Sequence, residues 1–564
     1  MRRQMGLGRV TCAVIGVSLL VAASALLAPQ TVGGGAASAD PVRSGVRVAA
    51  ASEPNEAVLT WLRKSLSGGK PWNVVVVLTD DQPKSMMEDM TAVRRQVAAR
   101  GITYPNALVP ESICCPSRSA LLTGRLSDET GVYDNTRSGP PGGYWAFRSN
   151  GNEKRTIAVA LRKAGYRTGL FGKYFNEFGK YFTGKSPKGW SQFQAFTTTS
   201  RSGRYFSYPA TAFKNKRHKR RAASGKAVRN YSVRVLKKYS TKHFGQQTVR
   251  FIKSTPPRKP LFALLTPYAP HSPFRAKQQH RSTLTDTRWW ASDPSIMEQD
   301  VSDKPKYVRD QDPEEVLANN PLGSKYVRQR ETLLSVDNQV RKIVKVLKRT
   351  GRLDRTLLVY TSDNGYLHGQ HRLMRKFVPY RAATEVPLMI RYGNRTPVGL
   401  SDSRIAGANI DLSATIMAAA HVPWTSAGMS LIGTAKRTGL PLKAAAYSAS
   451  PSVRRPPYCG WRTDQEAFVR YGSGEEEYYD YVSDPFELTN RVDDPDVADR
   501  VAVLRSAARL ACANVPPDFG PSFDEPTWEY PPDPTPEPTP EPTPEPTPSE
   551  SPSESPSESP SETP

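Results

Sequence analysis

A short run of β-branched residues places the strongest limit on what this chain can fold into. Residues 72–78 read Trp-Asn-Val-Val-Val-Val-Leu, so a strand formed there carries apolar side chains on both faces. Such a strand fits the interior of a parallel sheet that helices cover on both sides. Asp80 and Asp81 follow, at the strand end where open α/β sheets bind ligands. Their oxygen atoms suit Ca²⁺ or Mg²⁺, although two helix-capping aspartates would give the same pattern.

Two later segments repeat this order of a buried strand followed by polar residues. Residues 261–265 lead to His271, which lies between prolines, and residues 357–360 lead to Asp363 and Asn364. Taken alone, a histidine in such a loop has a structural role as readily as a catalytic one, and Asp-Asn-Gly is typical of a turn. The repetition predicts one large α/β domain with polar groups gathered at one edge of its sheet.

Helices are predicted between these strands. A helix near residues 157–164 precedes a short strand that ends at Phe171, and Gly172 and Lys173 come next. Residues 326–348 predict a long helix, because apolar residues recur there at helical spacing and Asp337 lies off that stripe. The stripe consists of Leu333, Val336, Val340, Ile343, Val344 and Leu347.

Two adjacent cysteines, Cys114 and Cys115, precede Pro, Ser and Arg118 in the sequence. A disulfide between neighbours would strain both the bond and the peptide that joins them. A cysteine near an arginine, at a turn that leads into an apolar run, is a candidate for a reactive thiol. The alternative is a pair of cysteines buried at the start of a helix.

The complete string over residues 114–125, Cys-x-Pro-Ser-Arg followed by Leu-Thr-Gly-Arg, resembles the signature of the sulfatase family. In that family the first cysteine is oxidised to formylglycine, an aldehyde held as its hydrate. The resemblance implies that Cys114 is converted by a formylglycine-generating maturation enzyme and that Cys115 is the variable position. One hydroxyl of the hydrate would attack sulfur and the other would later expel sulfate, which divides the reaction into two easier stages.

The resemblance extends along residues 72–520 and implies an alkaline-phosphatase-like fold: a large mixed, mostly parallel sheet flanked by helices, with a smaller C-terminal α+β subdomain. Arg118 would stabilise the hydrate, and His271 would donate a proton to the leaving alcohol or contact the sulfate. The implied ligands of one Ca²⁺ are Asp80, Asp81, Asp363, Asn364 and the residue formed from Cys114. The implied catalytic residues are Cys114, Arg118, Lys173, His271 and Lys376, of which the two lysines would contact the sulfate.

The chain also departs from the family pattern. Phe175 stands where many members have a histidine, and Arg381 replaces a glutamate in the segment that Lys376 opens. Segments such as residues 173–179 and 360–366 resemble the N-acetylglucosamine-6-sulfatase branch in particular. The sequence assigns no role to Asn176 or His371.

The chain carries a formal net charge of +25, and its acidic last 34 residues leave +33 for residues 1–530. Such a surplus favours polyanionic partners, namely nucleic acid, anionic lipid or sulfated polysaccharide, although it also serves solubility. The densest basic run lies at residues 214–221. It is interpreted either as a solvated loop or as a segment that contacts a polyanion. An export signal argues against nucleic acid.

Five segments are predicted along the chain. Residues 1–39 read as a signal peptide that ends in Ala-Ser-Ala, with an uncleaved membrane anchor as the alternative, and no other apolar segment is long enough to span a bilayer. An N-terminal extension (40–70), a catalytic domain (71–435), a C-terminal subdomain (436–526) and a disordered Pro/Thr/Ser/Glu-rich tail (527–564) follow.

The C-terminal subdomain is predicted to hold an aromatic hairpin at residues 475–482 and a helix near 497–510. Cys459 and Cys512 also lie there and are candidates for a disulfide in an exported protein.

These features predict a secreted sulfatase that acts on sulfated carbohydrates or aryl sulfates, with association with the cell surface as an alternative location. Three alternatives stay open: a phosphate or phosphonate ester hydrolase on the same fold, a non-catalytic polyanion-binding surface protein, and a nucleic-acid binder. The last rests on the basic run alone, and the export signal argues against it.

Overall fold

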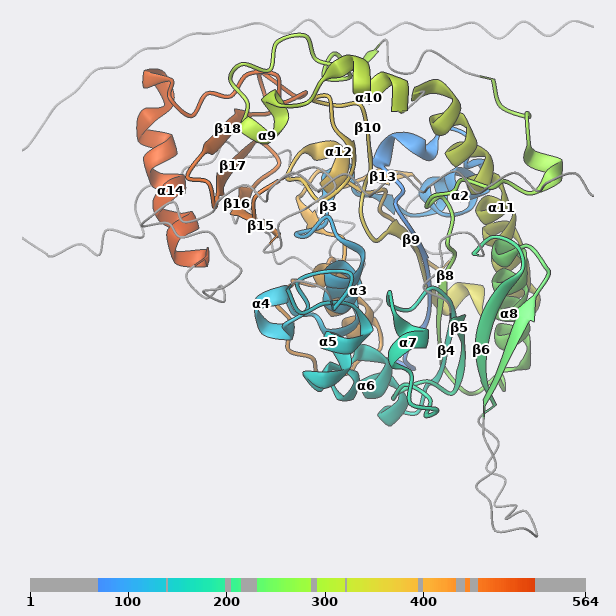
Figure 1. Ribbon diagram of the computed structural model, residues 1–564. Helices are drawn as coiled ribbons and strands as arrows, with labels where there is room; N and C mark the ends of the chain where they lie inside the picture. Colours follow the sequence, from blue (N-terminus) through green and yellow to red (C-terminus); the bar gives the residue numbers. More distant parts are fainter. Residues whose placement is uncertain are drawn as a thin grey trace, which may run out of the picture. The chain divides into compact units, whose positions relative to one another are not determined.

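A ten-stranded sheet forms the centre of the described part of the chain (Figure 1). Its strand order is β13-β2-β12-β9-β1-β8-β4-β5-β6-β7. The strands are β1 (Asn73–Thr79), β2 (Ile102–Thr103), β4 (Arg167–Gly172), β5 (Gln192–Phe196), β6 (Tyr208–Lys214), β7 (Tyr231–Leu236), β8 (Leu261–Thr266), β9 (Thr356–Ser362), β12 (Met389–Tyr392) and β13 (Leu400–Ser401).

This computed structural model describes residues 69–137, 140–197, 204–214, 231–285, 292–319, 322–393, 399–432, 442–446 and 455–512. All of them belong to a unit that spans residues 48–564. The predicted signal peptide and tail, nearly all of the N-terminal extension, and the basic run after Lys214 lie outside the described residues.

The middle of the sheet is parallel. Strand β1 pairs in parallel with β8 and β9, and β4 pairs in parallel with β8 and β5. Strands β12, β6 and β7 run antiparallel to their neighbours toward the two edges. The predicted mixed, mostly parallel sheet is therefore confirmed.

Strand β1 is buried on both faces, as its sequence predicts. Val74 and Val76 belong to one hydrophobic cluster, whereas Val75 and Val77 belong to another. All four side chains are fully buried, because successive residues of a strand point to opposite sides of the sheet.

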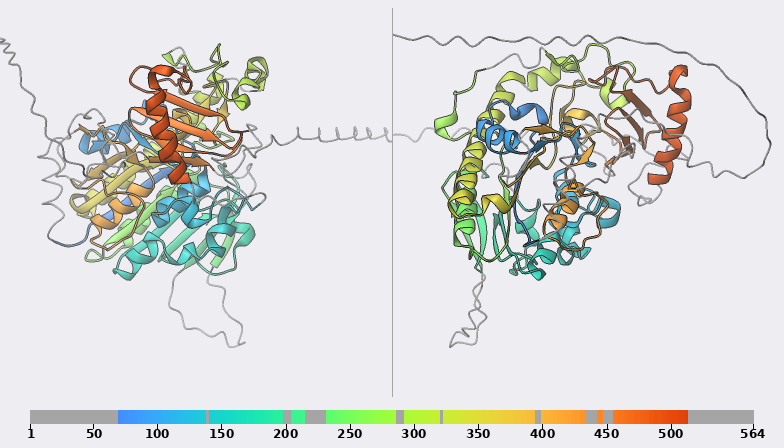
Figure 2. Two further views of the ribbon diagram at one scale, coloured as in Figure 1. Left: turned by 90° about the vertical axis from the view of Figure 1, so that its left-hand side faces the viewer. Right: turned by 180° about the vertical axis from the view of Figure 1, so that it is seen from behind.

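Helices cover both faces of this sheet, and Figures 1 and 2 show them on its opposite sides. Residues of α2 (Thr91–Gln96), α8 (Ser240–Ser254) and α11 (Leu322–Arg349) contribute to the cluster that contains Val75. Residues of four other helices contribute to the cluster that contains Val74: α3 (Cys114–Thr123), α5 (Gly143–Ser149), α6 (Ile157–Lys163) and α13 (Ile410–Ala419).

The predicted long helix is α11, and all six residues of its apolar stripe are buried. Asp337, which lies off that stripe, holds the start of α2. Its two carboxylate oxygens each accept a hydrogen bond of 2.9 Å, from the backbone N–H groups of Ala92 and Val93. These donors have no partner within the helix, so a residue from another helix supplies the cap.

A four-stranded antiparallel sheet lies near the C-terminus, in the order β15 (Leu442–Ala446), β16 (Tyr458–Arg462), β17 (Glu466–Tyr471) and β18 (Glu476–Asp480). The predicted hairpin at residues 475–482 is wrong, because that segment forms the single strand β18. The turn lies earlier, where Gly474 adopts a φ of 88° and the chain reverses from β17 into β18.

The remaining elements are short, apart from the C-terminal helix. Among the described residues, no helix combines the length and apolarity needed to cross a membrane. The elements are β3 (Ala107–Leu108), β10 (Leu367–His368), β11 (Met374–Arg375), β14 (Ala406–Gly407), α4 (Ser127–Thr130), α7 (Phe178–Tyr181), α9 (Lys306–Arg309), α10 (Pro313–Asn319), α12 (Arg381–Thr384) and α14 (Ala498–Cys512), with 3₁₀ helices at Lys84–Met87, Ala98–Arg100, Asn152–Lys154, Gln278–His280, Leu353–Arg355 and Pro495–Val497.

Cys459 and Cys512 form a disulfide, which confirms the candidate pair. The bond joins β16 to the last residue of α14 across a separation of 53 residues. It therefore fixes the C-terminal helix to the small sheet.

Replacing both cysteines, in Cys459→Ser/Cys512→Ser, should lower the free energy of unfolding by about 2–4 kcal/mol, because the unfolded chain gains freedom. Urea denaturation of the full chain, followed by circular dichroism, measures the loss. Wild-type protein in reductant should lose the same amount, and the variant should not respond to reductant. An unchanged midpoint in the variant would contradict this expectation.

Candidate active site

The polar residues predicted from sequence follow four strands that are neighbours in the sheet. Asp80 and Asp81 follow β1, Lys173 follows β4, His271 follows β8, and Asp363 follows β9. The order β9-β1-β8-β4 is parallel throughout, so all four carboxyl ends lie at one edge. This is the edge where open α/β sheets bind ligands.

Cys114 is the first residue of α3 and faces this edge. Its Sγ lies 3.6 Å from Asp80 Oδ1, 3.9 Å from Asp81 Oδ1 and 2.7 Å from Lys376 Nζ. Only 1% of the residue is exposed, and burial raises the pKa of its thiol although Lys173 and Lys376 act against that rise. The cysteine thus lies at the centre of a buried, highly charged cluster.

Cys115 points away from the cluster. Its Sγ accepts a hydrogen bond of 3.3 Å from the backbone N–H of Asn176, and its own N–H donates to Asn135 Oδ1 at 2.9 Å. Burial raises the pKa of this thiol to about 12. Both cysteines are therefore buried at the start of a helix, as one interpretation of the pair expects. Only Cys114 contacts the charged groups, as the other interpretation expects of a reactive cysteine.

Three carboxylates and the thiol of Cys114 form a potential metal site. One ligand atom each from Asp80, Asp81, Asp363 and Cys114 lies within 4.8 Å of the others. Asp80 Oδ2 is buried and accepts no hydrogen bond among the described residues, which leaves a carboxylate oxygen for a cation. Asn364 lies beside them, with its Nδ2 2.8 Å from Asp81 Oδ1. An oxygen-rich set of this kind fits Ca²⁺ or Mg²⁺.

Three cationic side chains pair with these carboxylates. Lys173 Nζ lies 2.7 Å from Asp80 Oδ1, and Arg118 Nε lies 2.8 Å from Asp363 Oδ2. Lys376 Nζ contacts Asp81 Oδ1 and also lies 3.1 Å from the side-chain oxygen of Asn364. Every buried carboxylate of the cluster therefore has a cationic partner, as buried charges require.

These ion pairs set the protonation states. Burial raises the pKa of Asp80, but Lys173 and His271 outweigh that effect and hold the pKa at about 2. Burial also raises the pKa of Asp81, and Lys376 more than reverses that rise. In turn, burial lowers the pKa of Lys173, but Asp80 leads the anions that raise it above the usual value for lysine. The cluster thus contains ionised carboxylates and charged lysines at neutral pH.

His271 lies beside Asp81 with one ring nitrogen already committed. Its Nδ1 lies 2.8 Å from the carbonyl oxygen of Ser272, so Nδ1 is the donor in that contact. Nε2 lies 3.6 Å from Asp81 Oδ2. Burial lowers the pKa of the imidazole although Asp81 and Asp80 act in the other direction.

The backbone at two positions is specialised to bring these groups together. Asp81 has a φ of 67°, in the left-handed region that side chains other than glycine rarely adopt. Gly172, just before Lys173, has a φ of 130°, and a Cβ there would lie 1.9 Å from the carbonyl oxygen of Thr266. Only glycine fits this position, which explains the Gly-Lys pair.

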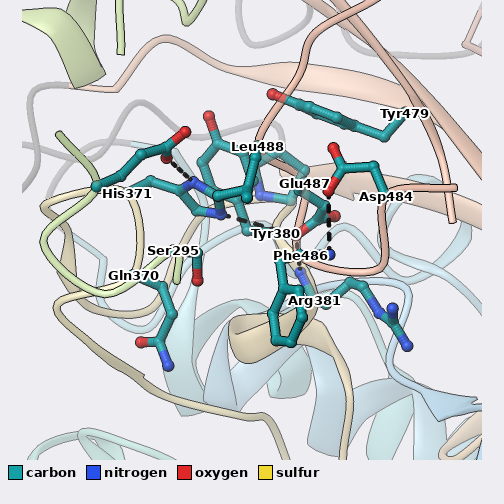
Figure 3. A network of polar contacts seen from close by, with 12 residues as sticks. Ser295, Gln370, His371, Tyr380, Arg381, Tyr479, Asp484, Phe486, Glu487 and Leu488 are labelled. Carbon is teal, nitrogen blue, oxygen red and sulfur yellow. Dashed lines mark hydrogen bonds and ion pairs between the residues drawn. The ribbon is translucent and has the colours of Figure 1, made fainter. Parts of the chain in front are cut away.

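The segment that carries Lys376 is attached to the C-terminal sheet (Figure 3). His371 Nδ1 lies 2.6 Å from Glu298, and its Nε2 lies 3.9 Å from Glu487. The backbone N–H of Arg381 donates to Glu487 at 2.8 Å, and the hydroxyl of Tyr380 donates to Glu477, also at 2.8 Å. Residues on both sides of Lys376 are therefore held by buried carboxylates.

Arg462 on β16 adds a contact that the sequence does not indicate. Its guanidinium donates to the carbonyl of Pro379 at 2.8 Å and to Thr384 Oγ1 at 2.6 Å. It also lies 3.2 Å from Glu487, and the residue is only 2% exposed. No local pattern marks Arg462, because two of its partners lie about 80 residues earlier in the chain and the third lies 25 residues later.

Comparison with known proteins gives the family. The sulfatase family model matches residues 72–422, more than half of the chain, and the chain belongs to the sulfatase family. The human N-acetylglucosamine-6-sulfatase is 31% identical over 365 residues, which cover 62% of this chain and 61% of that protein. A Drosophila melanogaster relative named as an extracellular sulfatase SULF-1 homolog is 28% identical, over 62% of this chain and 30% of the relative.

The fold is shared with solved sulfatase-family structures. One of them, described in complex with its substrate D-glucosamine-2-N,6-O-disulfate, matches with a TM-score of 0.63 and 22% identity, over 80% of this chain and 99% of that chain. The chain spans about three fifths of the length of the human protein.

The structure brings together all nine predicted site residues. They are Asp80, Asp81, Cys114, Arg118, Lys173, His271, Asp363, Asn364 and Lys376, joined by the contacts above. Their chemical roles stay predictions.

Replacing the buried guanidinium, in Arg462→Met, should lower the free energy of unfolding by about 3–5 kcal/mol, because Glu487 loses a buried cationic partner. Arg500→Met is the matched control: Arg500 also pairs with a glutamate, Glu466, but its side chain is 28% exposed. The control should lose less than about 1 kcal/mol. Urea denaturation measures both, and equal losses would contradict the assigned role of Arg462.

Proposed function

We propose that this protein is an exported sulfatase that hydrolyses sulfate esters of sulfated sugars, with N-acetylglucosamine 6-sulfates as the expected class. The observation that carries the proposal is the position of Cys114 Sγ, 3.6 Å from Asp80 and 2.7 Å from Lys376 at the carboxyl edge of the sheet. The family signature places a nucleophile at this residue, and anion-binding groups surround it.

The metal of the proposal is Ca²⁺. Asp80, Asp81, Asp363 and Asn364 would hold it together with residue 114. The unpartnered Oδ2 of Asp80 and the hard oxygen donors support this choice. When bound, the ion supplies positive charge that neutralises sulfate oxygens.

The proposal also includes the conversion of Cys114 to formylglycine. A thiol is a soft ligand, whereas Ca²⁺ prefers oxygen, so the sulfur is the one donor that does not match the rest of the set. A hydrated aldehyde would place oxygen there and supply a nucleophilic hydroxyl group. A maturation enzyme that recognises residues 114–125 is the partner that this requires.

The other residues would bind the sulfate group, orient the nucleophile and transfer a proton to the leaving alcohol. Lys173 and Lys376 lie on two sides of Cys114 and would contact the sulfate oxygens, where positive charge stabilises the transferring group. Arg118, paired with Asp363, would orient the nucleophile. His271 can donate a proton from Nε2 only as an imidazolium, because Nδ1 already donates to Ser272. It would protonate the leaving alcohol or contact the sulfate.

Export is supported by two features. Residues 1–39 have the composition of a signal peptide, and Cys459 and Cys512 form a disulfide, a bond that persists in oxidising compartments. We propose a secreted location, with the tail as a spacer from the cell surface.

Replacement of the proposed nucleophile, in Cys114→Ala, should lower kcat for an aryl sulfate by about 10³-fold or more, because no hydroxyl nucleophile remains. The protein should be produced in a host that contains the maturation enzyme, and mass spectrometry of the peptide should show aldehyde at residue 114 of the wild type. Cys115→Ser is the matched control and should retain turnover, since its oxygen can still accept from Asn176. Turnover by Cys114→Ala near the wild-type rate would reject the proposal.

A paired assay distinguishes the alternative ester. The sulfate and phosphate monoesters of one phenol should be compared at equal pH and ionic strength, and kcat/KM should be higher for the sulfate. A higher value for the phosphate would identify the protein as a phosphoester hydrolase on this fold. No turnover of either ester by protein with aldehyde at residue 114 would favour the non-catalytic alternative.

A further inference from the structure

A second site for an anion is suggested by a basic pocket beside the start of α8. The pocket has a volume of about 470 Å³, and its charged lining residues are Lys238, Lys242, Lys277 and Arg281. Among the residues that the structure describes, no carboxylate lines it. None of these four side chains forms an ion pair with a carboxylate among the described residues, in contrast to the lysines of the candidate active site.

The positive charge of this pocket affects the groups around it. Burial lowers the pKa of His243, and Lys238 and Arg250 lower it further. Burial likewise lowers the pKa of Lys342, with Lys242 among the cations that add to the effect. Cations close enough to disfavour one another's charge gain stability when an anion lies between them. The pocket therefore favours an anionic ligand.

The pocket and the candidate active site share one aromatic layer. Phe206 and Tyr239 line the pocket, with ring centroids 5.0 Å apart. Tyr239 stacks on Tyr205 at 5.9 Å, and the Tyr205 hydroxyl donates to the carbonyl of His271 at 2.7 Å. Lys277 also lies six residues after His271 in the chain. A ligand that extends from His271 past these aromatic rings would therefore reach the cationic side chains that line the pocket.

We propose that this pocket binds a sulfate or carboxylate group of an acidic polysaccharide. Aromatic rings and cationic or amide side chains are the groups that can contact both the apolar and the charged parts of such a chain. The binding is independent of catalysis, whereas its effect on turnover of a polymer rests on the proposed sulfatase function.

The test uses the full chain with two cations reversed, Lys238→Glu/Lys242→Glu, and a heparin-derived oligosaccharide as the probe. Calorimetric titration should show an affinity about tenfold or more below wild type, with a weaker dependence on salt, because fewer cations contact the polyanion. The matched control is Lys154→Glu/Lys163→Glu. It makes the same change of charge near α6, which packs on the opposite face of the sheet. The control should bind within about twofold of wild type.

Three results would overturn the proposal. One is an equal loss in both double variants, which would show a general effect of net charge. Another is displacement of the oligosaccharide by inorganic sulfate at equal molar concentration, which would show a site for the free ion. The third is tighter binding of a single-stranded oligonucleotide than of the oligosaccharide at the same salt concentration.

A kinetic measurement separates this proposal from the proposed function. In the Lys238→Glu/Lys242→Glu variant, kcat/KM for a small aryl sulfate should stay within about twofold of wild type, since neither lysine forms a hydrogen bond or ion pair with a site residue in the described part of the chain. The KM for a sulfated polymer should rise with kcat unchanged. If no ester is turned over, the titration still tests the pocket, and an unchanged affinity would reject it.

Discussion

The burial of three carboxylates in one small volume is the constraint on which the rest of this structure depends. Asp80, Asp81 and Asp363 are each at most 3% exposed, and their charges repel one another. Burying such groups without partners would cost several kcal/mol for each ion. Arg118, Lys173 and Lys376 offset that cost, and they come from a helix, a strand end and a distant loop. The cluster can therefore exist only after most of the sheet has formed.

The sequence predicts those parts of the site that follow directly from strands. A buried strand followed by polar residues is a local pattern, so the placement of Asp80, His271 and Asp363 at one edge could be inferred from topology alone. The signature at residues 114–125 added Cys114 by resemblance. The same local reasoning placed the apolar stripe of α11, because helical spacing is visible in the sequence.

The contacts that sequence reasoning missed join segments far apart in the chain. Asp337 caps α2 across 245 residues, and Arg462 reaches Pro379 across 83. Asp337 lies off an apolar stripe and Arg462 lies within an antiparallel strand, and neither position indicates a distant partner in the sequence. The hairpin at residues 475–482 was misplaced for a local reason: Tyr478, Tyr479 and Tyr481 cluster in and just after β18, but the turn lies at Gly474, before that strand.

The attachment of the Lys376 segment to the C-terminal sheet has a consequence for the order in which the protein becomes complete. The carboxylates and Cys114 all precede residue 364, whereas Glu477, Glu487 and Arg462, which hold the flanks of Lys376, are made about 100 residues later. A chain still on the ribosome would have every strand of the parallel core and the contact between His371 and Glu298, but not the later side chains that hold residues 379–384. Under the proposed function, a polypeptide truncated before β16 would therefore lack turnover, and the site would be complete only after the last part of the chain is made.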